Sequence, residues 1–589
     1  MKTWDLTPLY PSLDSEKFTN DVEKLKSLAA ELNHLVNEIT LNHEDETAKL
    51  EKYINLKKEL VMLSRSLSGY CHLITSADTN NEAAVKMAEV LQSIMNTTVS
   101  AETKATAWIA ACDLDTACAS SALLKEHEFI LNEKKEQMAH QLSDKEEMII
   151  ASMRQTGSDA WARLKDQLIG AHTVEMEISG EKKELPLTVV LNMAYSPDKE
   201  TRKAAYEAEI ASYKKDENSI AACLSGIKGE VLTTSALRGY KSPLEMTLIE
   251  SRMDQETLDA MLEAIREYLP VFRNYMKAKA EHLGYTNGLP FYEIYAPVSS
   301  ASKTYTYEEA CEFIKYHFGN FDKDLYNMAC RAIEENWIDV DSRPGKVGGA
   351  FCSPVPSLKQ SRVLLNFSGA FKSVVTMSHE LGHAFHNECA KNESVLNLNS
   401  PMQLAETAST FNETMVKKAA IASMPKDEAL AVLEAEVCGC NQVIVDIYSR
   451  FLFESALFEA RKNGAVSAKE LCRMMEQSQI DSYGDGLDPD YRHPYMWTWK
   501  PHYYYAGRNF YNFPYAFGQL FAKGLYAMYV EQGEAFIPVY KKLLASTGRM
   551  SIYDVCKSVG IDVHDVNFWR SSLDMCKADV ELFCKLVKE

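Results

Sequence analysis

The stretch FKSVVTMSHELGHAFHNECAK, Phe371–Lys391, decides how the rest of the chain is interpreted. It contains no proline and one glycine, Gly382, and its mixture of apolar and polar residues predicts a helix. Residues four apart lie on one face of a helix, so His379 and His383 are predicted to project together. Two imidazoles at that spacing can bind one zinc ion, with Zn–N distances of about 2.0–2.1 Å.

Glu380 follows the first histidine and completes the motif HExxH. In metalloproteases with this motif, the glutamate takes a proton from a water molecule that the zinc activates. Zinc lowers the pKa of that water towards ~7, so hydroxide is available at neutral pH. The motif therefore predicts zinc-dependent hydrolysis. The alternative is a solvated helix that carries two unrelated histidines.

A catalytic zinc site of this kind needs a third protein ligand. His386 is close in sequence, but the longer motif HExxHxxGxxH requires a glycine at position 386 and a histidine at position 389. This chain has His386 and Cys389 there. We therefore expect His386 to pack within the protein or to support the site rather than to bind the metal.

The segment QLAETASTFNET, Gln403–Thr414, supplies better candidates for the third ligand. Glu406 and Glu413 are seven residues apart, and we expect them on one face of a second helix. If that helix packs against the first, one carboxylate can reach the metal and the other can orient a histidine. Spacing alone does not choose between them, and Glu388 and Glu393 also stay open.

Composition limits the classes of function. The chain has 589 residues, of which 46% are hydrophobic, so it can bury a large core and form more than one domain. Its formal net charge of -20 argues against a general nucleic-acid-binding protein, because phosphate binding needs a basic face.

The cellular location is inferred from three further features. No stretch approaches the ~20 apolar residues of a membrane-spanning helix, and the start MKTWDLTPLY lacks the apolar run of a signal peptide. The 14 cysteines are scattered, which indicates reduced thiols in a reducing compartment. We expect a soluble cytoplasmic protein without a nucleic-acid or membrane partner.

Helical periodicity dominates the chain, and only two places are predicted to form strands. Val174–Ile178 alternates apolar and polar residues, Ser179 and Gly180 form a turn, and Leu185–Val189 alternates again, which predicts a hairpin. We place the domain boundary at this hairpin, with a helical N-terminal domain at 1–190 and a catalytic domain at 191–589.

The second predicted strand region is Lys346–Gly369. Val363–Phe367 is a short β-prone run, and Val347–Cys352 is its expected extended partner. Gly348 and Gly349 within that partner would let another backbone approach closely.

Several blocks of the sequence resemble one family. VLLNFSGAFKSVVTMSHELGHAFH, followed by LAETASTFNET, resembles the oligoendopeptidase F branch of the thimet-type oligopeptidases, as do WDLTPLYPSLDS and LTVVLNMAYSPDKETRKAAYEAE. The blocks span nearly the whole chain in the expected order. The resemblance implies a mainly α, two-lobed fold with a deep internal channel and a small β-sheet beside the zinc helix. It also implies one zinc ion per chain and the cleavage of short unfolded peptides.

The resemblance also implies a role for each residue of the two motifs. His379, His383 and Glu406 would bind zinc. Glu380 would be the general base, and Glu413 would orient a ligand histidine. This carry-over chooses between the carboxylates that spacing left open.

A third block, PHYYYAGRNFYNFPYAFG, is similar to the family's histidine followed by tyrosines. The similarity implies that His502, Tyr511 and Tyr515 stabilise the charged oxygen that forms during hydrolysis. The gap between the histidine and the first of these tyrosines is longer than in the thimet-type branch, so Tyr503–Tyr505 are alternatives. His493 is a rival for His502, and packing of aromatic residues in a core is the alternative for the whole segment.

The glycine-containing segment gains a function from the same resemblance. Gly348, Gly349 and Ala350 would form an edge along which the substrate backbone lies as an added strand. The alternative is a buried hairpin with no such role.

We therefore predict a zinc endopeptidase that acts on oligopeptides. A neighbouring possibility is an exopeptidase, such as a carboxypeptidase or dipeptidyl carboxypeptidase of the same broad family. A possibility from another class is a non-catalytic peptide-binding protein with a structural metal, but a structural site has no need of Glu380.

Overall fold

The computed structural model describes residues 2–178, 180–299 and 303–589. These residues pack into two compact units, each built from three stretches of the chain. Unit 1 comprises Met1–His140, Lys303–Val416 and Met528–Ile561, and unit 2 comprises Gln141–Ser302, Lys417–Ala527 and Asp562–Glu589. The boundary expected after residue 190 lies inside unit 2 and stays a prediction, because compactness and function need not divide a chain at the same residue.

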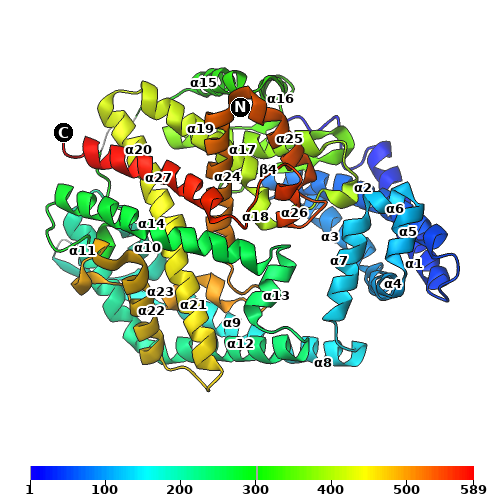
Figure 1. Ribbon diagram of the computed structural model, residues 1–589, viewed down its shortest axis with the longest axis horizontal. Helices are drawn as coiled ribbons and strands as arrows, with labels where there is room; N and C mark the ends of the chain where they lie inside the picture. The colour runs from blue at the N-terminus through cyan, green and yellow to red at the C-terminus, as the bar shows by residue number, and fades with distance from the viewer. Residues whose placement is uncertain (1, 179, 300–302) are drawn as a thin grey trace. The chain divides into compact units, whose positions relative to one another are not determined.

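Unit 1 is mostly helical, and its chain can be followed by colour in Figure 1. Its helices are α1 (Glu16–Ile39), α2 (Glu46–Ala77), α3 (Glu82–Asn96), α4 (Val99–Ala111), α5 (Leu114–Ser120), α6 (Ala122–Glu126), α7 (Glu128–Ala139), α15 (Tyr307–Phe321), α16 (Lys323–Glu334), α17 (Phe371–Ala390), α18 (Met402–Ala405), α25 (Phe536–Ser546) and α26 (Ile552–Lys557). Helices α19 (Thr407–Ser423) and α24 (Phe513–Gln532) continue from one unit into the other.

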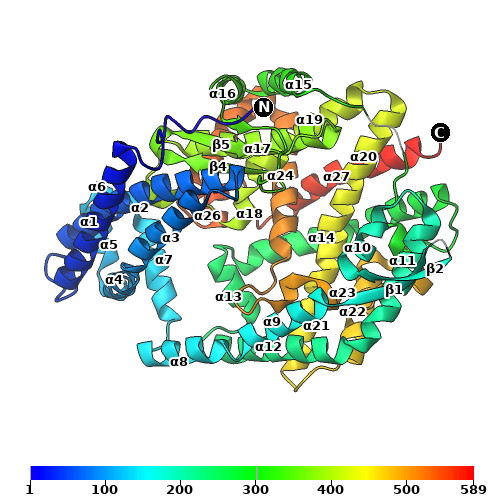
Figure 2. The same cartoon turned by 180° about the vertical axis from the view of Figure 1, so that it is seen from behind.

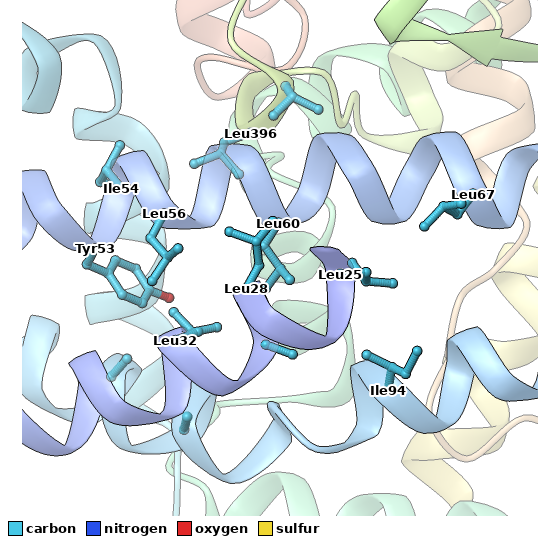
Figure 3. Packing of buried hydrophobic residues seen from close by; sticks show 14 of the residues in the cluster. Leu25, Leu28, Leu32, Tyr53, Ile54, Leu56, Leu60, Leu67, Ile94 and Leu396 are labelled. Carbon is cyan, nitrogen blue, oxygen red and sulfur yellow. The ribbon is translucent and has the colours of Figure 1, made fainter. Parts of the chain in front are cut away.

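The N-terminal helices of unit 1 share an apolar core. Helix α1 begins at Ser15, whose side chain accepts a hydrogen bond from the backbone N–H of Phe18. Apolar residues of α1 then recur at helical spacing and are buried against α2. Figure 3 shows Leu28 of α1 and Leu60 of α2 meeting in this core, with Leu396 from the segment that follows α17 nearby. The core therefore joins the N-terminal helices to the part of the chain that carries HExxH.

A small sheet lies beside α17, as Figure 2 shows, and it has three strands. Its strands are β3 (Ile338–Asp339), β4 (Phe351–Val355) and β5 (Gln360–Leu364), in the order β3-β5-β4. Strand β5 pairs in parallel with β3 and antiparallel with β4, which leaves β4 at an edge. The prediction of a small sheet next to the helix of the motif is thus confirmed.

The first of the two predicted strands begins later in the structure than in the sequence prediction. The first strand was expected to include Gly348 and Gly349, but both glycines precede β4 in a loop. Gly349 has a φ of +81°, which lies in the left-handed region and is incompatible with a regular strand. A Cβ at either position would have no atom within 4 Å beyond the neighbouring residues, so the glycines do not accommodate a close packing contact on that side. Another segment does reach the backbone here, because Nδ2 of Asn366 donates to the carbonyl oxygen of Gly349 at 2.9 Å.

Unit 2 is also mainly helical. Its helices are α8 (Asp144–Arg154), α9 (Ser158–Gly170), α10 (Leu187–Asn192), α11 (Lys199–Ser212), α12 (Glu217–Leu237), α13 (Pro243–Glu250), α14 (Gln255–His282), α20 (Lys426–Asn441), α21 (Ile447–Arg461), α22 (Ala468–Tyr483), α23 (Met496–Trp499) and α27 (Val566–Leu586). Its only two strands among the described residues are β1 (Thr173–Ile178) and β2 (Glu181–Pro186), which pair antiparallel.

The predicted hairpin is confirmed in its first part and wrong in its second. Val174 pairs with Leu185 as the alternation implies, whereas Leu187 and Val189 belong to α10. Leu187 and Val190 are buried three residues apart and Val189 is exposed, which is the pattern of a helix. Ser179, one of the two residues of the expected turn, lies outside the described residues.

The mainly α fold is confirmed, and the two-lobed shape and internal channel stay predictions. None of the helices in the described ranges is both long and apolar enough to cross a lipid bilayer. All fourteen cysteines are free thiols.

Candidate active site

Helix α17 places the two histidines of the motif on one face, as their spacing predicts. Its other faces carry Val374, Met377, Leu381 and Phe385, which are buried in unit 1 and fix the helix. His379 and His383 keep about a quarter of their side-chain surface exposed, at 25% and 22%. The apolar residues therefore hold the helix while the histidines stay accessible.

Gly382 allows a second segment to approach this face. A Cβ at Gly382 would lie 2.6 Å from the carbonyl oxygen of Ala408 and 2.6 Å from the Cα of Ser409. Any side chain at position 382 would collide with that backbone, at the start of α19. The glycine of HELGH thus permits the close packing of α17 on α19 that brings carboxylates next to the histidines.

The ligand atoms form a nearly regular triangle. The two Nε2 atoms of His379 and His383 are 3.2 Å apart, and each lies 3.3 Å from Oε2 of Glu406. Tetrahedral ligands at the Zn–N and Zn–O distances of about 2.0–2.1 Å are about 3.3–3.4 Å from one another. The three atoms therefore fit three corners of a tetrahedral zinc site, with the fourth corner free.

Glu406 and Glu413 were predicted to lie on one helix, but the structure places a break between them. Glu406 ends α18 and lies at the break before α19, whereas Glu413 lies within α19. Oε1 of Glu413 is 2.6 Å from Nδ1 of His379, and the Ser409 hydroxyl donates to Oε2 of Glu406 at 2.8 Å. Both carboxylates thus meet the histidines, and each contacts a different atom of the cluster.

These contacts shift the acid–base properties of the cluster. Burial lowers the pKa of His379, but hydrogen bonds to Glu406 and Glu413 outweigh burial and raise the pKa to about 10. Burial raises the pKa of Glu406, but its two imidazole partners outweigh burial and hold the pKa well below the usual range. Without metal the cluster therefore holds a proton on imidazole, and a bound cation would displace it.

Glu380 lies next to the triangle, with a carboxylate oxygen within 4.8 Å of a ring nitrogen of each histidine. Its side chain is 5% exposed, and burial raises its pKa. It lines a cavity of about 820 Å³ together with both histidines and Glu406. A buried carboxylate with a raised pKa beside a metal triangle can accept a proton and later release it.

The same cavity borders the edge strand. Ala350, which precedes β4, and Phe351 and Cys352 of β4 line it together with Glu380. Gly348 and Gly349 are not part of this lining. Strand β4 can thus offer backbone groups to an extended chain in the cavity, from residues slightly later than those predicted.

His386 has a structural partner, in agreement with its exclusion from the ligand set. Its Nε2 is 2.8 Å from the hydroxyl of Thr547, at the end of α25. Burial lowers the pKa of His386 to about 4, so the ring is neutral. The two other open candidates are paired as well: Glu388 binds Lys391 at 2.5 Å, and Glu393 binds Arg549 at 3.2 Å.

In unit 2, His502 forms an aromatic cluster with the two tyrosines predicted to act with it. The ring centroids of His502 and Tyr511 are 5.8 Å apart and nearly stacked, and Tyr515 lies 6.2 Å from His502 and 5.9 Å from Tyr511. Burial, with smaller contributions from Arg450 and Lys500, lowers the pKa of His502. The cluster therefore offers a neutral imidazole and two phenols as hydrogen-bond donors.

Most of the alternatives to this cluster are part of the core of unit 2. Tyr503 and Tyr504 are buried, and the Tyr504 hydroxyl donates to the carbonyl oxygen of Trp497 at 2.9 Å. His493 is buried with Nε2 2.8 Å from Glu209. Tyr505, which is 41% exposed, is the only one of these alternatives that reaches solvent.

Comparison with known proteins identifies the family. Residues 192–575 match the sequence profile of peptidase family M3, and residues 109–172 match that of Oligopeptidase F. The chain belongs to peptidase family M3. The resemblance seen in the sequence is thus confirmed, and this M3 chain is a metallo-oligopeptidase.

Relatives cover nearly all of the M3 chain. Oligopeptidase PepF of Bacillus subtilis is 23% identical over 571 residues, which cover 95% of this chain and 83% of that protein. An oligoendopeptidase F homolog of Borreliella burgdorferi is 24% identical and covers 99% of this chain and 98% of its own.

Solved structures share the fold. One from Chlamydophila abortus has a TM-score of 0.87 at 20% identity and covers 99% of this chain and 98% of its own. Oligoendopeptidase-F from Enterococcus faecium has a TM-score of 0.69 at 18% identity and covers 97% of this chain and 99% of its own.

Two features of the M3 chain were missed by the sequence reasoning. Arg65 of α2 lines the cavity of the histidines, more than 300 residues earlier in the chain, and no local motif marks it. A second group of possible metal ligands, His43, Glu46 and Cys112, lies among the N-terminal helices. Burial, followed by Glu46, raises the pKa of the Cys112 thiol to about 12, so that this group is less suited to a metal than the triangle.

Proposed function

We propose that the chain is a zinc-dependent endopeptidase that cleaves short unfolded oligopeptides. The observation that carries the proposal is the triangle of His379, His383 and Glu406, whose atoms are spaced as three corners of a tetrahedral zinc site. One zinc ion per chain would bind there, with Glu413 holding the ring of His379. When bound, zinc supplies a water of lowered pKa and polarises the peptide carbonyl.

The proton transfers are assigned to Glu380. Its position beside the triangle, in the same cavity, lets it take a proton from the attacking water and deliver that proton to the amine that leaves. Burial raises the pKa of Glu380, which makes the carboxylate a stronger base for the first transfer.

We assign stabilisation of the negative oxygen to His502, Tyr511 and Tyr515. The support is their mutual packing in unit 2 and their match to the family's histidine and tyrosines. A donor aimed at such an oxygen contributes about 2.7–4 kcal/mol to catalysis.

The substrate class follows from the names of the relatives and from the edge strand. The relatives are named oligopeptidase or oligoendopeptidase F, and β4 offers an unpaired edge to an extended peptide. Of the three residues expected to extend that edge, Ala350 lines the cavity and would continue the edge before β4, whereas Gly348 and Gly349 lie outside the cavity lining. Free cysteines throughout the chain support a reducing, cytoplasmic location.

The test is cleavage of a quenched peptide whose two ends are acetylated and amidated. We expect internal cleavage by mass spectrometry, loss of activity with a chelator and recovery with one equivalent of zinc. Cleavage only when an end is unblocked would indicate an exopeptidase instead. Binding without any turnover would indicate a non-catalytic peptide-binding protein.

A further inference from the structure

The cavity of the histidines contains a cation that the proposed reaction does not use. Arg65 lies on α2 and lines the same 820 Å³ space as His379, His383 and Glu380. Its side chain is partly buried, and burial lowers the pKa of its guanidinium. A positive charge removed from water in this way is unfavourable unless an anion or several hydrogen-bond acceptors meet it.

The protein supplies only a neutral acceptor to this guanidinium. Nη2 of Arg65 donates to Oδ1 of Asn399 at 2.6 Å. Among residues 2–178, 180–299 and 303–589, no carboxylate lies within 4.0 Å of it. A guanidinium carries five N–H donors in a planar fork, so most of the donors of Arg65 are left for a ligand in the cavity.

Apart from the histidines, Glu380 and Glu406 of the proposed zinc site, the other charged side chains around the cavity have their charge balanced or lie in solvent. Glu388 pairs with Lys391, and Glu393 pairs with Arg549. Lys359 donates to Asn392 at 2.7 Å and is exposed, so water solvates its charge. Arg65 therefore differs from its neighbours in being both partly buried and without an anion.

Asn399 prepares the guanidinium for binding. The segment that carries it is fixed on both sides, because Asn397 donates to the carbonyl oxygen of Glu126 and the Ser400 hydroxyl contacts that of Thr547. A side chain held in place by such an acceptor loses less conformational entropy when it binds a ligand.

We propose that Arg65 binds the C-terminal carboxylate of the peptide substrate, with Asn399 holding the guanidinium in position. This inference rests on the proposed peptidase function. A carboxylate matches the guanidinium fork with two parallel hydrogen bonds, and every linear peptide ends in one, whereas acidic side chains occur only in some. Contacts with strand β4 would be independent of sequence, and the bond to Arg65 would fix how many residues separate the cut from the C-terminus.

The wild-type enzyme alone tests the inference. Two quenched peptides of one sequence, one ending in a free acid and one in an amide, are compared by kcat/KM. We expect the free acid to be preferred about 10- to 100-fold, the range for hydrogen bonds between charged groups. Adding residues after the cut should move the cut by the same number, and adding them at the N-terminus should leave it in place.

Variants then assign the effect to the residue. In Arg65→Gln, kcat/KM for the free acid should fall to the value for the amide, while the value for the amide stays unchanged. Arg65→Lys should recover part of the preference, because a lysine keeps the charge without the fork. The matched control is Lys359→Gln, which removes an exposed cation from the same cavity and should keep the preference.

Four results would overturn the inference. The first is equal cleavage of free acid and amide by the wild type. The second is an equal loss on both peptides in Arg65→Gln, which would indicate a purely structural role. The third is an effect confined to peptides with an acidic side chain, which would make that side chain the ligand. The fourth is a wild type that cleaves neither peptide, which would overturn the proposed function as well, whereas the first three would leave it intact.

Discussion

Nδ1 of His379 lies 2.6 Å from Oε1 of Glu413, on the opposite side of the ring from the Nε2 atom that meets His383 and Glu406. The carboxylate therefore fixes which nitrogen of the ring is turned towards the triangle. It also makes that nitrogen a stronger donor to a metal.

Glu413→Gln should weaken zinc binding about 10- to 100-fold, because an amide holds the ring less firmly and does not increase its basicity. Competition with a chromophoric chelator measures the affinity. Glu388→Gln is the matched control, since its carboxylate pairs with Lys391 away from the triangle. An unchanged affinity in Glu413→Gln would show that the contact has no effect on the metal.

Glu380→Gln should keep the zinc and lose the activity. Glu380 is outside the triangle, so we expect one zinc per chain by metal analysis, with kcat lowered about 10²–10⁴-fold, the range for a lost general base. Full activity in freshly purified variant protein would refute the assignment of the base. Loss of zinc together with activity would show that Glu380 supports the metal instead.

Gly382→Ala should destabilise unit 1, because its Cβ would lie 2.6 Å from backbone atoms of Ala408 and Ser409. Forcing α17 and α19 apart should lower the free energy of unfolding by about 1–3 kcal/mol, as for overpacked cores, and weaken zinc binding. Gly439→Ala in α20 is the control, since no atom lies within 4 Å of its Cβ. It should leave stability unchanged or raise it by up to about 1 kcal/mol. Denaturant unfolding of both variants decides the comparison.

Tyr511→Phe should lower kcat about 10²–10³-fold with little change in KM, since the hydroxyl would bind the oxygen only when charge develops on it. Tyr505→Phe tests the alternative register and should have little effect. A larger loss of kcat in Tyr505→Phe than in Tyr511→Phe would assign the catalytic role to Tyr505 instead.

The buried His386 should make the stability of the protein depend on pH. Burial lowers its pKa from 6.5 to about 4 in the folded chain, so the unfolded chain binds more protons between these values. Stability should therefore fall as the pH drops from about 6.5 to 4. The measurement uses chelator-treated protein, so that metal binding does not contribute to stability. In His386→Gln, stability should fall less steeply over the same pH range. An equally steep decline in the variant would assign it to other groups.

The sequence predicted those features that depend on local geometry. The spacing of His379 and His383 on a helix was sufficient to place them together. Glu406 could be chosen only by resemblance, because the chain breaks between α18 and α19 at that residue. The apolar run at Leu187–Val190 fits the period of a strand as well as that of a helix, and packing on α11 and β1 decided for the helix.

Other features depend on contacts between distant parts of the chain, and no local pattern reveals these. Arg65 of α2 lines the cavity, and Leu396, from the segment after α17, is buried in the same core as α1 and α2. Gly349 likewise has a left-handed conformation within its loop, and β4 begins only after it.

The division of unit 1 among three stretches of the chain also has a consequence during synthesis. The cavity is lined by Arg65 from the first stretch, by His379 from the second and by Thr547 from the third. At a translation rate of about 5–20 residues per second, most of the chain has left the ribosome long before Thr547 is made. A nascent or truncated chain that lacks the third stretch therefore lacks part of the cavity wall, and the cavity is complete only when synthesis is nearly finished.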